Sequence, residues 1–376
     1  MSDNTAVLLQ AMRMGGALPP EIVEYMYHNG AFLLFLGFPQ ASEFGIDYKT
    51  WKTGERFMGL KMIPPGVHFV YCSIKSAPRI GFFHNFKAGE IVVKKWNKEA
   101  ETFEDGEVPA EQIPEKKRQL KSMDNSLAPY PYENYRSWYG LTDFITPETV
   151  ERVHPVLGRI TSQAELVSLE TQFMEDAERE HKETHFKNRV DRQNPVRTRF
   201  VDQHGLPIMK IREGYEIRFQ EIPALTVTKH QVGIDYSDRL YVLLRGLGGD
   251  WKQLLAEMQI AFVCFLQGQV FEGFEQWKRI IHLMSCCSNA LGSEKELFMA
   301  FIRVLFFQLK ECPTDFFVDI VSRDNFLTTT LSMLFANVRD SAHGGAELKK
   351  KTAQFKQYLT NQFKWDFDCE DGGEKL

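Results

Sequence analysis

The chain has 376 residues, of which 43% are hydrophobic, 25% charged and 13% aromatic, and its formal net charge is −5. This composition is typical of a folded globular protein of about two domains and excludes a disordered chain. The small acidic excess also excludes a protein that binds nucleic acid through its net charge, because phosphate backbones attract clustered Lys and Arg.

The N-terminal third predicts a domain rich in β-strands. The opening MSDNTAVLLQAMRMGG has no basic segment ahead of an apolar core, so we expect no signal peptide. Pro20 and the pair Asn29 and Gly30 would bracket a short helix. The stretches AFLLFLG, VHFVYCS and RIGFFHNF predict strands, and NFKAGEIVVKKW predicts a hairpin that turns at residues 87–89.

A rigid turn is predicted inside KMIPPGVHFVY. Pro64 and Pro65 fix φ at two residues, whereas Gly66 accepts a positive φ. The turn could be an active-site loop, a recognition surface or a corner of the sheet. No nucleophile, base or metal-binding set lies near it, and we expect His68 to be packed or on the surface. A sheet corner is therefore favoured, with its surroundings as a candidate for partner binding.

The region from residue 111 onwards changes character. EQIPEKKRQLKSM predicts a helix, and APYPYENYRSWYG is an aromatic segment whose prolines, Pro129 and Pro131, oppose regular structure. We expect this segment to pack against the sheet. Residues 1–160 are therefore predicted to be a β-rich domain, similar to a sandwich or a barrel, with peripheral helices.

A charged linker and a returning strand are predicted for residues 161–222. Charges of both signs crowd EDAEREHKETHFKNRVDRQNPVRTRF, as in a solvated helix or a linker. In GYEIRFQEIP the apolar residues Tyr215, Ile217 and Phe219 alternate with polar ones, which predicts a half-buried strand that could return to the first sheet.

Helical periodicity dominates residues 223–366. We expect five or six helices, with Asp250 as the N-cap of one and with Gly268 and Gly273 interrupting or softening the next. RGLGGDW predicts a turn between helices rather than a phosphate loop, because it lacks the GK[ST] ending. Residues 367–376 would form a short acidic tail, and the fold class is α+β with two domains.

Two patterns suggest chemistry, but both have simpler explanations. His181 and His185 have the spacing of a shared metal site, although the charged segment predicts a solvated helix face instead. His282 with Cys286 and Cys287 could activate a thiolate, yet an amphipathic helix favours buried structural cysteines. Since the six cysteines include no CxxC pair, a zinc ribbon is not expected, and we predict no catalytic, cofactor-binding or metal-binding residue.

The C-terminal segment FKWDFDCEDGGEKL offers an aromatic face. Phe363, Trp365 and Phe367 alternate with charged residues, so an extended chain after the last helix would present them together. This face could dock on its own domain or add a strand to the sheet of a partner.

Blocks spread over both predicted domains resemble a known family. EFGIDY, GLKMIPPGVHFVY, GFF, PYPY, AFVCFL, FEGFEQWKRII, DFFVDIVSRDNFL and FKWDF occur in this order and resemble the Aar-two splicing factor family (cistron-splicing factor). The resemblance covers residues 31–367 and fails mainly at residues 175–214. It implies a helical C-terminal domain similar to VHS domains and a protein that is not an enzyme.

The resemblance also implies partners in the cytoplasm and the nucleus. Family members escort the core protein Prp-eight during biogenesis of the U-five small nuclear ribonucleoprotein (snRNP). They bind its RNase H-like and Jab-one/MPN domains and keep the helicase Brr-two away until maturation. These domains and the U-five snRNP precursor are the expected partners, with no membrane and no direct nucleic-acid binding. Only nine residues follow FKWDF, so the domain bodies should carry more of the contact than a tail.

The candidate site residues are therefore of two kinds. The partner-binding candidates are Pro64, Pro65, Phe363, Trp365 and Phe367. Phosphorylation would add charge at an interface, and the candidates are Ser322, Thr328, Thr329, Thr330 and Ser332. The alternatives are a helical adaptor for peptide motifs and a metal-dependent hydrolase.

Overall fold

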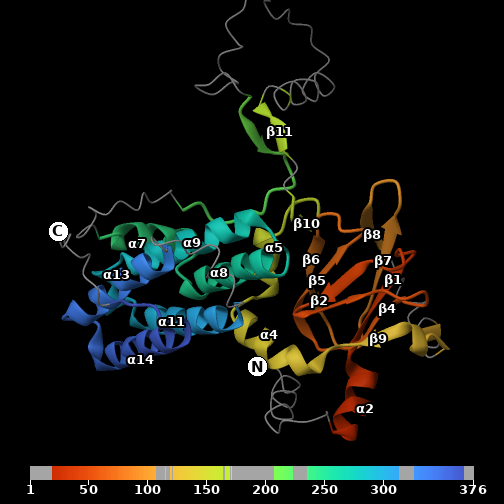
Figure 1. The fold of residues 1–376 in the computed structure, drawn as a ribbon, viewed down its shortest axis with the longest axis horizontal. Coiled ribbons are helices and arrows are strands. Elements are labelled where there is room, and N and C mark those ends of the chain that lie inside the picture. The colour runs from red at the N-terminus through yellow and green to blue at the C-terminus, as the bar shows by residue number, and fades with distance from the viewer. Residues whose placement is uncertain are drawn as a thin grey trace, which may run out of the picture.

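The structure is a computed structural model that describes residues 19–106, 115, 119, 120, 122–163, 166–169, 171, 207–222, 235–312 and 326–367. A β-rich part and a helical part lie next to each other, with helix α4 (Tyr135–Thr142) and helix α5 (Pro147–Val153) between them (Figure 1). The expected α+β architecture of two domains is confirmed.

Two five-stranded sheets form the β-rich part. One has the order β8-β7-β1-β4-β9 and the other β10-β6-β5-β2-β3. Phe35, Phe44 and Phe82 belong to the apolar core that these strands bury. The elements are α2 (Pro20–Asn29), β1 (Ala31–Leu36), β2 (Glu43–Ile46), β3 (Lys49–Lys52), β4 (Gly59–Ile63), β5 (Gly66–Ser73), β6 (Ile80–Phe86), β7 (Ile91–Asn97), β8 (Thr102–Gly106), β9 (Leu127–Pro129) and β10 (Ile160–Thr161).

The hairpin expected around residues 87–89 is wrong. A turn does form there, with Gly89 at φ +66°, but β6 and β7 belong to different sheets. The N–H of Gly89 donates to Asn29 and that of Phe32 donates to Glu90, both at 2.8 Å. These bonds place β7 parallel to β1, with five residue pairs from Phe32↔Ile91 to Leu36↔Lys95. The link therefore carries the chain from one sheet to the other.

The aromatic segment after residue 127 is more regular than its prolines predict. Leu127–Pro129 pairs in parallel with β4 as the edge strand β9, where a proline is tolerated because its missing N–H need not face a partner. Tyr132–Asn134 then forms a 3-10 helix ahead of α4. As expected, the segment packs against the sheets, because Tyr130 and Tyr132 are buried in their core.

The strand expected at residues 215–220 is absent, because these residues lie in a turn and in extended chain. Met209–Ile211 (β12) pairs instead with Leu166–Ser168 (β11), and this ribbon projects away from both parts of the molecule (Figure 1). Tyr215, Ile217 and Phe219 are nevertheless half-buried, as their alternation predicts. The alternation of apolar residues therefore reflects their burial against the neighbouring core and not pairing in a sheet.

The helical part confirms the expected helices. Asp250 caps α8 by accepting a hydrogen bond from the N–H of Lys252 at 3.1 Å, and residues 247–250 form the expected turn. Six helices of ten or more residues lie in the described C-terminal ranges 235–312 and 326–367, together with a single turn, α10 (Ala290–Ser293). The six are α7 (Ser237–Gly246), α8 (Trp251–Leu266), α9 (Phe271–Ser285), α11 (Lys295–Glu311), α13 (Phe326–Asp340) and α14 (Gly345–Phe363).

Helix α8 is buried on two sides. Leu255, Met258 and Phe262 belong to the core of the helical part, whereas Ile260 and Val263 belong to a second core together with Phe69 and Phe83 of the sheet. Helix α9 crosses α8 so closely that a Cβ on its Gly273 would lie 2.6 Å from the carbonyl oxygen of Ala261. Gly273 thus permits close helix packing and does not interrupt α9.

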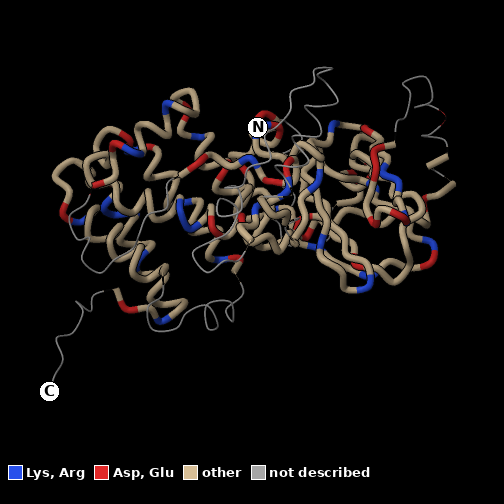
Figure 2. Tube along the Cα trace, turned by 90° about the horizontal axis from the view of Figure 1, so that it is seen from above, with Lys and Arg blue, Asp and Glu red and all other residues tan. Residues whose placement is uncertain are grey.

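Charged residues of both signs occur along the whole described trace (Figure 2). Lys and Arg alternate with Asp and Glu along both parts of the molecule (Figure 2). A search of the described residues finds no helix with the length and apolar character that crossing a membrane requires.

Candidate protein-interaction site

The turn at residues 64–66 lies at a corner of the β-rich part, between β4 and β5. Pro64 is buried, whereas Pro65 and Gly66 are half-buried. Gly66 has φ +138°, a conformation that favours glycine. The physical expectation of a defined turn that leads into a strand is confirmed.

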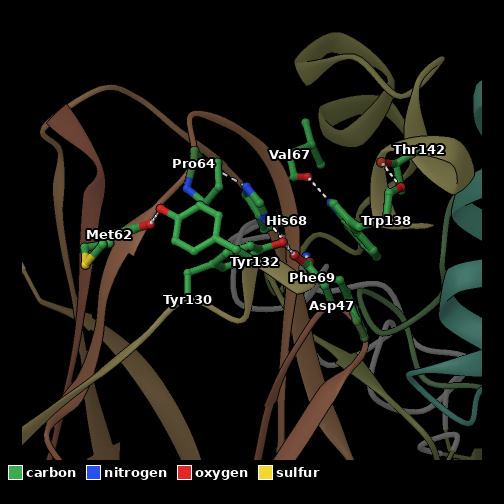
Figure 3. Close-up of polar contacts among 10 residues, drawn as sticks. All are labelled: Asp47, Met62, Pro64, Val67, His68, Phe69, Tyr130, Tyr132, Trp138 and Thr142. Atoms are coloured by element: carbon green, nitrogen blue, oxygen red, sulfur yellow. Dashed lines mark hydrogen bonds and ion pairs between the residues drawn. The ribbon is translucent and has the colours of Figure 1, made fainter. Parts of the chain in front are cut away.

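A buried histidine holds this turn in place (Figure 3). His68 is 1% exposed, and its Nε2 lies 2.8 Å from the carbonyl oxygen of Pro64. Its Nδ1 lies 2.7 Å from Oδ2 of Asp47. A carbonyl oxygen can only accept, so Nε2 carries a hydrogen and donates to Pro64, while Nδ1 faces the Asp47 carboxylate. His68 is thus a packed histidine that serves the fold and has no nucleophile beside it.

Further donors complete the shell around Asp47. The N–H of Phe69 donates to Oδ1 at 3.0 Å, and the hydroxyl of Tyr130 donates to Oδ2 at 2.5 Å. Burial and the neighbouring carboxylate raise the pKa of Tyr130 well above its ordinary value. The hydroxyl therefore keeps its proton and remains a donor, so every side of the buried carboxylate has a partner.

A small hollow lies beside the turn, where the β-rich part meets α4. Its volume is about 150 Å³, and its lining includes Pro65, Gly66, Trp138, Tyr139 and Asp143. Trp138 stacks over His68 and donates its indole N–H to the carbonyl of Val67 at 3.0 Å. The hollow thus has rigid aromatic walls, which suits an anchor residue of a protein partner.

A second buried carboxylate joins the two parts of the molecule. Glu257 of α8 is 0% exposed. Its Oε2 accepts from Arg152 of α5 at 2.8 Å, and its Oε1 accepts from the N–H of Gln220 at 2.7 Å and from Gln276 of α9 at 2.9 Å. One side chain thus connects two helices of the helical part with α5 and with the chain that enters from the ribbon.

The C-terminal aromatic residues dock on their own domain. The chain leaves α14 through Lys364 at φ +60°, and residues 364–367 form neither helix nor strand. Trp365 is 8% exposed and belongs to the helical core. It stacks on Phe363, and Phe367 makes an edge contact with Phe335. Of the two alternatives for this face, the structure shows the intramolecular one, whereas a role in partner binding remains a prediction for these residues.

The phosphorylation candidates differ in accessibility. Thr329 is exposed near the start of α13, whereas Thr328 and Ser332 are half-buried. Thr330 is 0% exposed, and its hydroxyl has no hydrogen-bond partner among the described residues. A kinase could therefore reach Thr329 without unfolding the helix. Ser322 lies outside the described residues.

His282, Cys286 and Cys287 do not form a reactive site. Burial raises the pKa of the Cys286 thiol to about 12 and also raises that of Cys287, so both stay protonated and are poor nucleophiles. Burial lowers the pKa of His282. Within the described ranges no group of three or more His, Cys, Asp or Glu side chains could hold a metal ion. His181 and His185 fall outside those ranges.

The sequence predictions missed Asp47, Tyr130 and Glu257. A signal existed for Glu257, because it is the single charged residue of LLAEMQIAFVCFL, and a lone carboxylate in such a run must find buried partners. Asp47 in EFGIDY gave only a turn signal.

Comparisons with known proteins match both parts of the chain. Residues 29–155 match the family model described as the AAR2 N-terminal domain. Residues 216–368 match the model described as the AAR2 C-terminal repeat region. The two matches follow the order of the β-rich and helical parts.

Full-length relatives agree with these matches. The protein AAR2 homolog of Caenorhabditis elegans is 88% identical over 357 residues, which cover 95% of this chain and 100% of the relative. The protein AAR2 homologs of Mus musculus and Homo sapiens are each 36% identical, and the alignments cover 94% of both chains.

Proposed function

The chain belongs to the AAR2 family, which is the Aar-two family that the motifs indicated, and we propose that it is a non-enzymatic assembly factor that binds Prp-eight. Membership of this family relates its function to splicing. In this proposal it binds the RNase H-like and Jab-one/MPN domains during biogenesis of the U-five snRNP, between cytoplasm and nucleus. It thereby blocks early binding of the helicase Brr-two.

The observation that carries the proposal is the family match over both domains, at 36% identity to the mammalian relatives. The described fold supports it, because α4, α5 and α8 join two domains into one body that can present a fixed surface. The hollow beside Pro65 is a rigid candidate contact on that surface. A VHS-like character of the helical domain is part of the same proposal.

Co-migration of purified components tests the proposal. The full chain is mixed with the RNase H-like domain, with the Jab-one/MPN domain and with both, and each mixture is analysed by size-exclusion chromatography. We expect a stable complex with the RNase H-like domain and a tighter one when both are present. Added Brr-two should then fail to bind. Failure to bind either domain would overturn the proposal.

Trp365 needs care as an interface probe, because its burial predicts a loss of stability when it is replaced. Pro65→Ala is a cleaner variant, since the side chain is half-buried and lines the hollow. If the hollow receives a partner side chain, Pro65→Ala should weaken the complex while the unfolding midpoint changes little.

A further inference from the structure

The outer edge of the sheet β10-β6-β5-β2-β3 is only partly covered. β10 pairs with β6 at two positions, Ile160 with Gly81 and Thr161 with Ile80. β6 continues to Phe86, and among the described strands none pairs with its outer side beyond Gly81. Within the described part of the chain, residues 82–86 therefore have no strand on their outer side.

The outward backbone groups of this stretch belong to Phe83 and Asn85. Gly81 faces Ile160 of β10, and the N–H of Ser162 donates to the carbonyl of Arg79 at 2.8 Å. Odd-numbered residues thus turn their backbone groups outward, and the direction alternates along a strand. The N–H and C=O of Phe83 and Asn85 therefore point away from β5, where no described residue bonds to them.

Helix α5 forms the opposite wall of a groove along this edge. The groove has a volume of about 490 Å³ and is lined by Phe83 and Asn85 on the strand side and by Pro147, Val150 and His154 on the helix side. Thr146 fixes the start of this wall, because its hydroxyl accepts the N–H of Thr149 at 3.2 Å. A strand edge that faces a helix is the geometry in which extended peptides bind by strand addition.

The chemistry of the groove selects its occupant. Val150 and Val156 offer apolar surface, and Val156 is 73% exposed. Arg218 donates to the backbone carbonyls of His154 at 2.8 Å and Glu151 at 2.6 Å. Glu151 supplies a carboxylate that also lines the groove. The groove thus combines an apolar wall with one cation, Arg218, and one carboxylate, Glu151.

We propose that this groove is a docking site for an extended segment of a partner protein, which adds to β6 as a strand next to the position of β10. The N–H and C=O of Phe83 and Asn85 would pair with its backbone. An apolar side chain would lie against Val150 and Val156, and an acidic side chain would face Arg218. The proposal continues the ladder that β10 begins, and it is independent of the partners named above.

Defined peptides test the groove directly. The probes are acetylated and amidated peptides of about seven residues that alternate valine and threonine, with one central aspartate or, as the matched control, one lysine. Binding is followed by NMR through the amide signals of the full chain. We expect the aspartate peptide to shift and protect the Phe83 and Asn85 amides and to bind about fivefold more tightly than the lysine peptide.

Two substitutions at one position separate backbone pairing from side-chain contact. Asn85→Pro removes the outward N–H that β5 does not use, which an edge strand tolerates, whereas Asn85→Ala keeps it. The aspartate peptide should bind Asn85→Pro about tenfold more weakly and Asn85→Ala within about twofold of the original. Equal binding to both variants, or no change at Phe83 and Asn85 with any peptide, would overturn the proposal.

A surface variant and a measurement of size complete the test. Val156→Glu changes an exposed side chain, so it should fold normally and reject the aspartate peptide while retaining the lysine peptide. Unchanged preference would contradict the proposed occupant. Sedimentation of the free protein tests whether a second copy of this chain occupies the groove. A dimer that Asn85→Pro abolishes would show self-association at the β6 edge and would overturn the proposal of a different protein as the partner.

Discussion

Asp47 and Glu257 are both buried carboxylates, but Asp47 connects segments within one domain, whereas Glu257 connects the two domains. Asp47 lies within the β-rich part and receives donors from His68, Phe69 and Tyr130. Glu257 lies between the parts and receives donors from α5, α9 and residue 220. The first fixes one corner of one domain, whereas the second fixes one domain to the other.

The side chains that contact the two carboxylates differ in exposure, which sets the expected cost of losing each carboxylate. The side chain of His68 is 1% exposed, whereas that of Arg152 is 33% exposed. If its carboxylate partner is removed, Arg152 can therefore be hydrated, but the buried His68 cannot. Loss of Asp47 should consequently cost more than loss of Glu257, although Glu257 spans a larger part of the molecule.

The largest effect is expected for Asp47→Ala. Removal of the carboxylate leaves the buried His68 ring, the Phe69 N–H and the Tyr130 hydroxyl without their partner, and it should lower the free energy of unfolding by about 4 kcal/mol. Asp47 also has φ +54°, so Asp47→Asn is the matched control, because asparagine tolerates this backbone. Urea unfolding measures both variants. A loss below about 1 kcal/mol for Ala would show that the cluster is not a stabilising unit.

Glu257→Ala should cost about 3 kcal/mol, at the low end for a broken buried pair, because Arg152 can be rehydrated. Fluorescence of the two parts should then report separate unfolding transitions, since the link between them is weakened. Glu296→Ala replaces an exposed glutamate of α11 and should change stability by less than about 0.5 kcal/mol. A single unchanged transition in Glu257→Ala would contradict the linking role.

The third largest effect is expected from acid, which should destabilise the fold around His154 at the end of α5. Burial lowers the pKa of His154 from 6.5 to about 4, so the folded state binds fewer protons than the unfolded state between these values. Stability is full above about pH 6.5 and falls as the pH drops toward 4, by about 2 kcal/mol between about pH 7.5 and 5. Urea titrations at both pH values measure the slope.

His154→Gln is the control for this slope, because glutamine does not titrate. The dependence should flatten and leave the smaller contributions of His84 and His282, whose pKa values burial also lowers. An unchanged slope would assign the acid sensitivity to those histidines instead.

The smallest effect is expected for Thr146→Ala, which removes the cap of α5 and should cost about 1 kcal/mol. Thr146→Ser keeps the hydroxyl and should cost less. Thermal unfolding distinguishes the two. Equal losses would mean that the hydroxyl bond to Thr149 does not stabilise the helix that faces the β6 edge.

Local patterns in the sequence predicted most elements, because strands such as AFLLFLG and helices such as α8 follow from side-chain periodicity. The local patterns failed where the pairing partner of a segment, rather than its own sequence, decides its structure. The turn at residues 87–89 looks like a hairpin, yet β7 pairs with β1 over five residues and not with β6. Ile217 and Phe219 instead pack against the core that Val153 of α5 and Ile260 of α8 share with the sheet, and no described strand pairs with this segment.

The candidate site was predictable only in part. The turn at Pro64 and the packing of His68 follow from local sequence, but their partners do not. Asp47 and Tyr130 are 83 residues apart, and no local pattern signals that two such residues will share a hydrogen bond. Trp365 shows the converse, since its aromatic alternation is compatible with a partner surface and with its own core.

The double burial of α8 has a consequence for synthesis on the ribosome. The sheet residues Phe69 and Phe83 are covered by Ile260 and Val263, which emerge only after the whole β-rich part has been made. During that interval a nascent chain would present an uncovered aromatic sheet face, the kind of surface that chaperones bind. During translation, this core of the β-rich part can therefore be completed only after α8 has been synthesised.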